Sequence, residues 1–351
     1  VFEVIGGAGM QAAGCKSLYP LEALSVMGLT EVLGRFVKLL RLRRALARQL
    51  LANPPDLFIG IDSPGFNLGL EERLKRAGIP TLHYVSPQVW AWRGWRIRQI
   101  RRAVDHMLVL FPFESGYYRS QEVPVTFVGH PLADEIEAAP DRAEVRARLK
   151  LETDGPVIAL LPGSRASELK AHADLFVRTA LWLSRRNPGM HFIAPFVNRE
   201  TRLIFERAVK RQAAWDLPLT RLHGHSHEAM GAADAVLLAS GTAALEALLL
   251  RRPMVVTYRV SLPSYLLIRL LARIEHYSMP NHLAGRALVP ELVQFDATPE
   301  KLGAAVEQCL ADAAKTQETL AAYEDIAHRL RCNANERAAE AVLALLGAAH
   351  G

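Results

Sequence analysis

The sequence predicts an α/β fold in which two doubly wound parallel sheets face each other across a cleft. Short apolar segments alternate with amphipathic helical patterns, which is typical of parallel sheets with right-handed crossovers. This alternation runs twice along the chain, with the linker-like segment Ala139-Pro140-Asp141 between the two runs. The length of 351 residues fits two domains of ordinary size. We therefore expect an N-terminal domain over residues 1–150 and a C-terminal domain over residues 151–351.

The N-terminal half supplies short strands with helices between them. Apolar residues recur at helical spacing in residues 33–52 and 68–76. Strands are expected at residues 2–5, 57–61, 81–85, 106–111 and 125–128. The sequence begins Val-Phe-Glu-Val-Ile-Gly-Gly without an initiator Met, as though it entered its domain at a second strand. We therefore expect the first strand of this domain, with its glycine turn and helix, to be missing.

The C-terminal half repeats this plan after a charged helix expected at residues 142–150. Its strands are expected at residues 157–161, 191–195, 235–239 and 253–258. Residues 315–349 are rich in Ala and Leu and are expected to be helical, packing on the first domain or on a partner subunit. Ligands of such sheets bind beyond the carboxyl ends of the strands, so the cleft between the domains is the expected site.

Composition narrows the class of protein. The formal net charge of +6 favours an acidic partner, which could be a nucleotide, a nucleic acid or an anionic membrane surface. The three cysteines are far apart and lack C-x-x-C spacing, which indicates neither a disulfide framework nor a zinc site and favours a reducing cytoplasm. No apolar run reaches the roughly 18 to 20 residues that a membrane span needs.

The most informative segments are two strands that break into helices at turns of small residues. The first turn is Gly163-Ser164-Arg165. The N-terminus of a helix offers unpaired backbone N–H groups and a positive dipole end, so an anion can bind there. Arg165 adds a permanent forked cation beside it.

The second turn, Ser240-Gly241-Thr242, has the same character. Glu246 follows Thr242 by four residues on the same helical face, where a carboxylate can accept hydrogen bonds from a ribose diol. Turns in α/β proteins also carry Gly and Ser for geometry alone. The pair of turns, one with an arginine and one with a glutamate, favours a nucleoside-diphosphate site.

A carboxylate stands at the end of a predicted strand in the first half. Asp62 follows this strand and would face the cleft, where it could act as a general base or orient a hydroxyl. It could equally be the N-cap of a helix beginning near Leu68, a role that Asn67 could also fill.

An aromatic loop follows the next strand and runs from His83 to Arg93. Trp90 could stack on a sugar or an acyl chain, and His83 or Arg93 could contact a phosphate, although tryptophans are more often part of the core. Ser86 lies in the same loop and is counted with these cleft candidates. His130, in Gly129-His130-Pro131, is a possible acid, phosphate contact or turn residue.

A metal site is not expected. The stretch from His223 to His227 carries three histidines but is a loop with only Glu228 as an acidic neighbour, and metal sites need three or four converging ligands. No D-x-D carboxylate pair occurs in the chain, which argues against a divalent ion on a diphosphate. Arg165 and the helix N-termini would then meet the charge of a leaving nucleotide.

Two basic segments remain open to more than one interpretation. Residues 95–102 mix cations with apolar residues, as an RNA-binding module does, but a helix with one solvated basic face explains them equally. Residues 29–44 have the pattern of a helix lying in a membrane interface, or of a core helix with a basic outer face. The candidate docking residues of this helix are Val32, Leu33, Phe36, Leu39, Leu40, Arg41 and Arg44.

Taken together, these motifs resemble the lipid-A-disaccharide synthase family over residues 6–332, in uninterrupted order. The aromatic loop is the most specific part of the likeness. The matching segments are Gly60-Ile-Asp-Ser-Pro-Gly-Phe-Asn67, His83-Tyr-Val-Ser-Pro-Gln-Val-Trp-Ala-Trp-Arg93, Leu161-Pro-Gly-Ser-Arg165, Ala239-Ser-Gly-Thr-Ala-Ala-Leu-Glu246 and Pro280-Asn-His-Leu-Ala-Gly-Arg286.

The resemblance implies a GT-B glycosyltransferase of two Rossmann-like domains that works with inversion and without metal or cofactor. It would join UDP-2,3-diacylglucosamine to 2,3-diacylglucosamine 1-phosphate, releasing UDP. Asp62 would be the base and Arg165 the counter-ion of the departing diphosphate, while Asn281 and Arg286 match family positions near the cleft. The family works as a peripheral protein at the inner face of the cytoplasmic membrane, which favours the docking interpretation of residues 29–44. Homodimers that exchange C-terminal segments are known in the family.

The chain departs from the family pattern in two places. The usual first strand and its Ser-Gly-Asp type turn would lie upstream of Val1, so the acceptor side of the cleft is expected to be incomplete. Gly65 stands where the family commonly has an aspartate, which removes a second carboxylate beside Asp62. The alternatives are another UDP-sugar enzyme of the same fold, such as an epimerase or a peptidoglycan glycosyltransferase, and a basic RNA-binding module.

Overall fold

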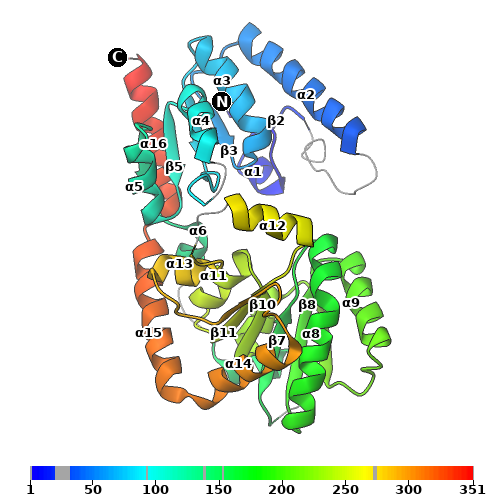
Figure 1. Ribbon diagram of the computed structural model, residues 1–351. Coiled ribbons are helices and arrows are strands. Elements are labelled where there is room, and N and C mark those ends of the chain that lie inside the picture. The colour runs from blue at the N-terminus through cyan, green and yellow to red at the C-terminus, as the bar shows by residue number, and fades with distance from the viewer. Residues whose placement is uncertain are drawn as a thin grey trace.

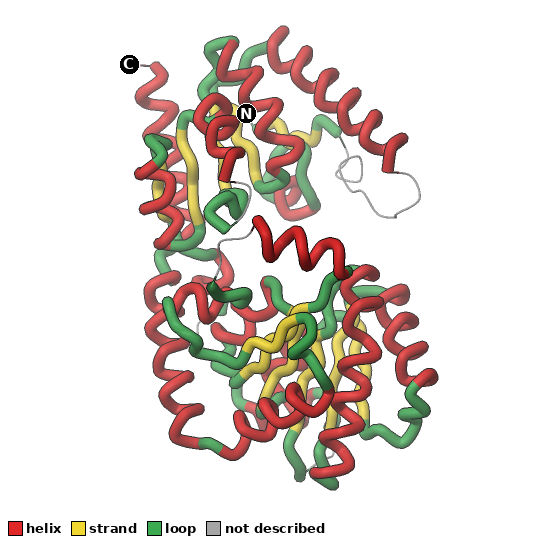
Figure 2. Tube along the Cα trace, in the orientation of Figure 1, coloured by secondary structure: helices red, strands yellow, loops and turns green. Residues whose placement is uncertain are grey.

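The computed structural model describes residues 2–19, 32–91, 94–136, 140–151, 154–271 and 275–350. In these residues it contains two large parallel sheets, one in each of two domains that lie one above the other (Figure 1). Helices surround the strands in both domains (Figure 2). The expected α/β class with a parallel sheet in each of two domains is confirmed. The strand order reverses in the second sheet and follows the chain in the described part of the first.

The first domain is built on a four-stranded parallel sheet of order β3-β4-β5-β6. Its strands are β3 (Phe58–Ile61), β4 (Thr81–Tyr84), β5 (His106–Val109) and β6 (Val125–Phe127). A separate parallel pair joins β1 (Glu3–Val4) to β2 (Lys16–Ser17). The helical elements are α1 (Ala8–Ala12), α2 (Val32–Ala52), α3 (Pro64–Arg76), the 3-10 turn η3 (Gly94–Arg96), α4 (Ile97–Ala103) and α5 (Pro112–Ser120).

The second domain is built on a six-stranded parallel sheet of order β12-β11-β10-β7-β8-β9. Its strands are β7 (Val157–Leu161), β8 (His191–Phe196), β9 (Leu219–His223), β10 (Ala235–Ala239), β11 (Met254–Tyr258) and β12 (Glu291–Val293). Its helices, with the two that lead into it, are α6 (Pro131–Glu135), α7 (Arg142–Arg148), α8 (Ala166–Arg186), α9 (Arg199–Arg211), α10 (Ser226–Ala232), α11 (Thr242–Leu249), α12 (Leu262–Leu271), α13 (Met279–Ala284), α14 (Pro299–Ala311) and α15 (Ala313–Leu330).

The central strands of the second sheet were predictable because helices cover both of their faces. Every residue of β7 and of β10 is buried, which gives continuous apolar runs. Strands β2, β9 and β12 were not predicted. Apart from the exposed His223, the residues of β9 and β12 are partly buried and include Arg221 and Glu291, so these strands at the two edges of the sheet lack an apolar run.

The helix boundaries differ from expectation at two places. Helix α3 begins at Pro64 rather than near Leu68, and its N-cap is Ser63. The expected helix over residues 315–349 is two helices, because the chain turns at residues 331–333 and Asn333 has a φ of 56°. The break separates α15 from α16 (Ala334–His350).

The chain crosses between the domains twice, and the two crossings are bonded to each other. Asp134 accepts hydrogen bonds from the amides of Cys332 (3.0 Å), Asn333 (3.1 Å) and Ala334 (2.6 Å), which caps the start of α16. In return Arg331 donates to the carbonyls of Ala133 and Ile136. The two connections between the domains therefore form one unit.

The last helix packs on the first sheet, not on the second. Leu82, Leu108 and Val128 are buried there under α16 residues Ala338, Ala341, Val342 and Leu345. Figure 1 shows α16 beside β5 and α5, above α15. The expected division at residue 150 assigns this helix to the second domain, whereas its packing is with the first.

Candidate functional site

The two predicted turns lie side by side at the carboxyl edge of the second sheet. Strands β7 and β10 are neighbours in parallel register, with Leu161 near the end of one and Leu238 near the end of the other. The turns that follow them therefore open on the same edge of the sheet, where ligands of such sheets bind.

At the first turn the backbone amides are already paired. The carboxylate of Glu168 accepts hydrogen bonds from the amides of Ser164 (2.9 Å) and Arg165 (3.2 Å). Gly163, with a φ of 127°, lies so close that a Cβ would stand 2.5 Å from the Cβ of Glu168. A carboxylate of the chain thus occupies the position at which we expected an external anion.

The Arg165 side chain remains available to a ligand. It is 81% exposed and lies 3.4 Å from the Glu168 carboxylate. An ion pair this exposed is weak and readily exchanged. Glu168 stands three residues after the N-cap Arg165, the position from which a glutamate bonds back to the N-cap amide, and this role was not predicted from the sequence.

The second turn is more open. Gly241 and Thr242 are exposed, and α11 begins there without a side-chain cap. The Ser240 hydroxyl donates to the Tyr277 carbonyl at 2.8 Å, so this side chain serves the protein itself. Glu246 lies one turn into α11, mostly buried, with His227 Nε2 at 3.4 Å.

Asp62 stands at the carboxyl end of β3, exposed to solvent. Both Asp62 (φ 48°) and Ser63 (φ 44°) are in the left-handed region, which costs free energy for residues other than glycine. Asn67 Nδ2 holds this turn by donating to the carbonyls of Ile61 (3.1 Å) and Asp62 (2.8 Å). The N-cap interpretation of Asp62 and Asn67 is wrong, since Ser63 is the N-cap and Asn67 lies inside α3.

His83 does not reach the cleft. Its side chain is fully buried, with Nδ1 2.7 Å from the Glu71 carboxylate. Burial raises the pKa of Glu71, and the neighbouring His83 partly offsets this rise. Gly60 leaves the room for the pair, because a Cβ there would collide with Glu71. His83 was counted with the aromatic loop that follows the strand, but it lies inside β4, where alternate side chains point to opposite faces.

Ser86 and Trp90 meet at a buried carboxylate that the sequence analysis missed. Glu114 of α5 accepts from the Ser86 hydroxyl (2.5 Å) and from Trp90 Nε1 (3.3 Å). Burial raises the pKa of Glu114, while these hydrogen bonds lower it. The indole of Trp90 stacks on the ring of His282. Arg93, the remaining candidate of this loop, lies outside the described residues.

His130 is a buried N-cap. Its Nδ1 accepts from the Leu132 amide at 3.2 Å at the start of α6, and its ring lies 5.5 Å from that of Phe111. Burial lowers the pKa of His130 to about 4, so the imidazole is neutral near pH 7. Among the interpretations that the sequence left open, the geometry matches the turn residue.

Asn281 is enclosed in protein contacts rather than open to the cleft. Its Oδ1 accepts from the amides of Leu288 and Val289, both at 2.7 Å. Its Nδ2 donates to the Val289 carbonyl (2.9 Å) and to Glu291 (2.7 Å). These four bonds use the full capacity of the amide. Arg286 is exposed and lies against α15, with Nη1 3.1 Å from Glu318.

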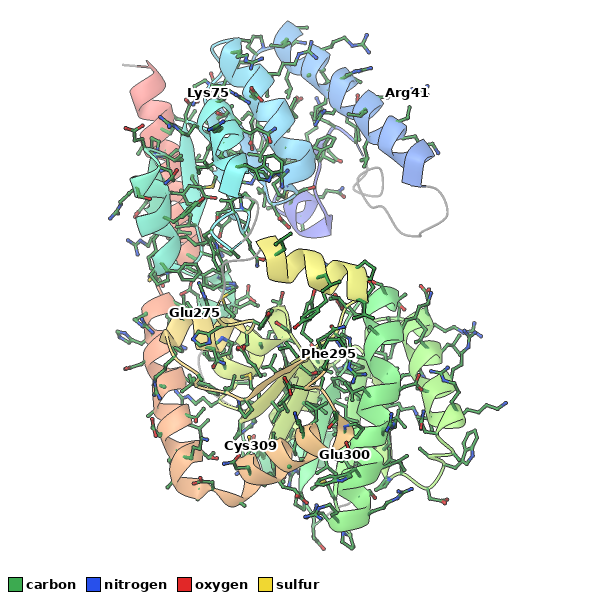
Figure 3. The ribbon with its side chains drawn as sticks, viewed as in Figure 1. Arg41, Lys75, Glu275, Phe295, Glu300 and Cys309 are labelled. Carbon is green, nitrogen blue, oxygen red and sulfur yellow. The ribbon has the colours of Figure 1, made fainter. Side chains whose placement is uncertain are left out.

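The basic helix α2 carries its cations on an exposed side. Arg41 and Arg44 are exposed, and Leu39 and Leu40 are half-buried. Figure 3 shows Arg41 on α2, on the side of the first domain away from the second. The side chains of Val32, Leu33 and Phe36 lie outside the described residues. None of the helices described in this structure is long and apolar enough to cross a membrane.

The other charged stretches have partners within the chain. Arg101 pairs with Glu122 (2.6 Å) and Arg102 with Glu72 (2.9 Å), which reduces the basic face considered for RNA. His225 lies 3.0 Å from Glu228. Across the described ranges, no group of three or more metal-ligating side chains comes together.

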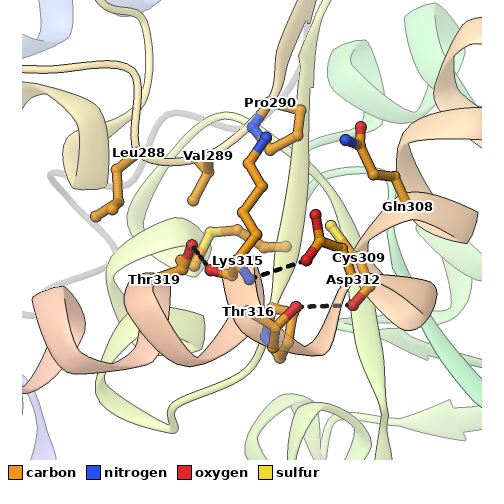
Figure 4. A pocket seen from close by; sticks show the side chains of 11 residues that line it. Leu288, Val289, Pro290, Gln308, Cys309, Asp312, Lys315, Thr316 and Thr319 are labelled. Atoms are coloured by element: carbon orange, nitrogen blue, oxygen red, sulfur yellow. Dashed lines mark hydrogen bonds between the residues drawn. The ribbon is translucent and has the colours of Figure 1, made fainter.

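A small pocket lies elsewhere, beyond the amino ends of β11 and β12. Leu288, Val289 and Pro290 line it on one side, and Cys309 and Lys315 of α14 and α15 line it on the other (Figure 4). Burial raises the pKa of the Cys309 thiol to about 11. Because this pocket lies at the amino ends of the strands, it is separate from the turns at the carboxyl edge.

Comparison with known sequences identifies the family. The family model of lipid-A-disaccharide synthetase matches residues 2–345. The lipid-A-disaccharide synthase of Pseudomonas aeruginosa strain PAO1 is 51% identical over 343 residues, covering 97% of this chain and 89% of that protein. The lipid-A-disaccharide synthase of Methylobacillus flagellatus is 47% identical over 345 residues, covering 98% and 91%.

Solved structures share the fold at low sequence identity. UDP-GlcNAc 2-epimerase from Neisseria meningitidis, bound to UDP-GlcNAc, has a TM-score of 0.62 at 14% identity, covering 95% of this chain and 87% of that one. A glycosyltransferase from Rickettsia africae has a TM-score of 0.58 at 9% identity, covering 98% and 89%. These likenesses confirm two Rossmann-like domains in the GT-B arrangement. The family match over nearly the whole chain goes further: this chain belongs to the lipid-A-disaccharide synthase family of glycosyltransferases, which acts in lipid A biosynthesis.

Proposed function

We propose that this chain transfers 2,3-diacylglucosamine from UDP to the 6-hydroxyl of 2,3-diacylglucosamine 1-phosphate, with inversion and without metal or cofactor. The observation that carries the proposal is the pairing of two small-residue turns on adjacent strands β7 and β10, with Arg165 at one and Glu246 at the other. Family membership supports the choice of acylated sugars as substrates.

The proposed step is a single displacement. Asp62 takes the proton of the acceptor 6-hydroxyl, whose oxygen forms a bond to the anomeric carbon as the bond from that carbon to the UDP oxygen breaks. Arg165 and the start of α11 meet the negative charge that develops on the diphosphate, so no metal is required for this role. Glu246 accepts hydrogen bonds from the ribose hydroxyls.

We further propose that the protein works as a peripheral protein at the inner face of the cytoplasmic membrane, with α2 on the lipid surface. The exposed Arg41 and Arg44 would be attracted to anionic headgroups. A homodimer remains a proposal from the family alone. The domain limits at residues 1–150 and 151–351 also remain a proposal, except that α16 packs on the first sheet.

The test is a reconstituted reaction in detergent, with both acylated sugars and with EDTA, following UDP and disaccharide. Arg165→Ala should lower kcat about 10²- to 10³-fold, as expected when one charged group facing a transition state is lost. Arg165→Lys should recover part of the rate, and Arg202→Ala on the exposed face of α9 should leave it unchanged. UDP release without disaccharide would favour another UDP-sugar enzyme. Salt-sensitive RNA binding with no turnover would favour the binding module.

A further inference from the structure

Three aromatic rings from the two domains are in contact. The Trp90 ring stacks on the His282 ring, with centroids 4.4 Å apart and planes 21° from parallel. Phe113 lies edge-on to both, at 4.8 Å from Trp90 and 4.5 Å from His282. Trp90 follows β4 and Phe113 belongs to α5, whereas His282 belongs to α13 of the second domain. The cluster is thus a contact between the domains.

On the first-domain side, buried hydrogen bonds fix the orientation of the indole. Trp90 Nε1 donates to Glu114, which also accepts from the Ser86 hydroxyl and, at 3.1 Å, from the Phe111 amide. A buried carboxylate that receives three donors leaves little freedom for the groups around it. The backbone segment 86–90 is therefore held at both Ser86 and Trp90.

On the second-domain side, the start of α13 is tied to the second small-residue turn. Glu291 accepts from the amides of Tyr277 and Ser278, both at 2.8 Å, and from the Ser278 hydroxyl at 2.5 Å. Ser278 is the N-cap of α13, the helix that carries His282. The carbonyl of Tyr277 accepts from the Ser240 hydroxyl. Bonded contacts therefore run without a gap from Ser240 to His282.

We propose that His282 is a positioning residue that couples the nucleotide turn at Ser240 to the aromatic loop of the acceptor domain. This inference rests on the proposed function, in which UDP-sugar binds at that turn and the acceptor faces the first domain. UDP bound beside Ser240 reduces the mobility of Tyr277 and α13. Because His282 of α13 stacks on Trp90, the mobility of Trp90 is reduced as well. The ring of His282 is covered by Trp90 and Phe113, so it acts through Trp90 rather than on the reacting atoms.

The size of the effect follows from the contact. An aromatic pair contributes about 0.5–1.5 kcal/mol beyond its buried area, which corresponds to about a twofold to tenfold change in an equilibrium constant. His282→Ala should therefore raise the KM for the acceptor severalfold and, because coupling between two sites is reciprocal, change the dissociation constant of UDP by no more than the same factor. His282→Phe retains a flat ring and should restore the wild-type KM. His328→Ala, an exposed histidine on α15, is the matched control.

The decisive measurement is hydrogen exchange of the amides of Ser86 and of residues 88–91, with and without UDP. We expect UDP to slow this exchange in the wild type and in His282→Phe but not in His282→Ala. Trp90→Ala removes the stack from the other side, so UDP should still slow exchange in α13 but no longer in the aromatic loop, and the test does not depend on one variant folding. Equal protection by UDP in His282→Ala and wild type would overturn the inference. If the wild type makes no disaccharide but the exchange pattern holds, the proposed function fails and the coupling stands.

Discussion

The carboxylate of Glu168 accepts a hydrogen bond from the Ser164 amide at 2.9 Å, at the turn where an external anion was expected. The same carboxylate lies beside the exposed Arg165 guanidinium. A diphosphate that approaches Arg165 therefore meets a negative charge of the chain itself.

Glu168→Gln should tighten UDP binding about fivefold. The amide oxygen can still cap Ser164, while removal of a unit charge at about 4 Å removes a repulsion of about 1 kcal/mol. Titration calorimetry with UDP measures the change, and Glu206→Gln on the surface of α9 is the control. Weaker binding in Glu168→Gln would mean that Glu168 instead holds Arg165 in its binding position.

Asp62→Asn should lower kcat/KM about 10²- to 10⁴-fold, the range for loss of a general base. Asparagine tolerates the left-handed backbone of this position, so the change removes charge and basicity but not the turn. Steady-state kinetics with both acylated sugars measures the loss. The exposed Asp216→Asn serves for comparison, and a wild-type kcat/KM in Asp62→Asn would assign the base elsewhere.

Asn281→Ala should lower the free energy of unfolding by at least about 2 kcal/mol. It leaves the buried amides of Leu288 and Val289 without their acceptor, and each unsatisfied buried group costs about 1–3 kcal/mol. Thermal denaturation measures the loss against the exposed Asn53→Ala. If the melting temperature is unchanged and substrate binding is weaker, Asn281 contacts substrate in the cleft instead of stabilising the fold.

These residues show where sequence reasoning reached its limit. Turns at the ends of apolar strands were located correctly because buried parallel strands have an unmistakable pattern, as in β7 and β10. Position along a strand did not tell which face a side chain takes, so His83 was assigned to the cleft although it lies against Glu71. Asn281 matched a family position, but its bonds to residues 288–291 depend on a loop that no local pattern reveals.

Partners from distant segments were equally hidden. Glu114 and Trp90 are 24 residues apart and meet only because α5 packs beside the aromatic loop. The hydrogen bonds between Asp134 and the amides of residues 332–334 join positions about 200 residues apart in the sequence. Pairings of this kind follow from the order of strands in the sheet, which the alternation of helices and strands alone does not define.

Stability should fall as the pH is lowered from about 6.5 towards 4, partly through His130. Its folded pKa of about 4 lies below the ordinary value of 6.5, so in this window the unfolded chain binds the proton more tightly. The difference corresponds to about 3 kcal/mol once the pH is below both values. His130→Asn keeps an acceptor for the Leu132 amide, and its melting temperature should vary less with pH. If the melting temperatures of the wild type and of His130→Asn vary equally with pH, His130 is not the cause of the loss of stability at low pH.

Charge reversal at Arg41 and Arg44 should release the protein from anionic vesicles. Each cation near such a surface contributes about 1 kcal/mol, and reversal adds repulsion of similar size. Co-sedimentation with vesicles rich in phosphatidylglycerol should fall at least tenfold, while the affinity for UDP stays the same. Reversal of Arg199 and Lys210 on α9 keeps the total charge equal and tests whether position matters. Equal loss in both pairs would point to overall charge rather than to α2.

The packing of α16 on the first sheet has a consequence for biosynthesis. Leu82, Leu108 and Val128 leave the ribosome between 210 and 260 residues before Ala338 and Val342, which cover them. Throughout that interval an apolar face of the first domain lacks its own cover and is open to chaperones or to another nascent chain. A fragment that ends before residue 334 would carry the same exposed face permanently, so the two halves of this protein are not separable at a single cut.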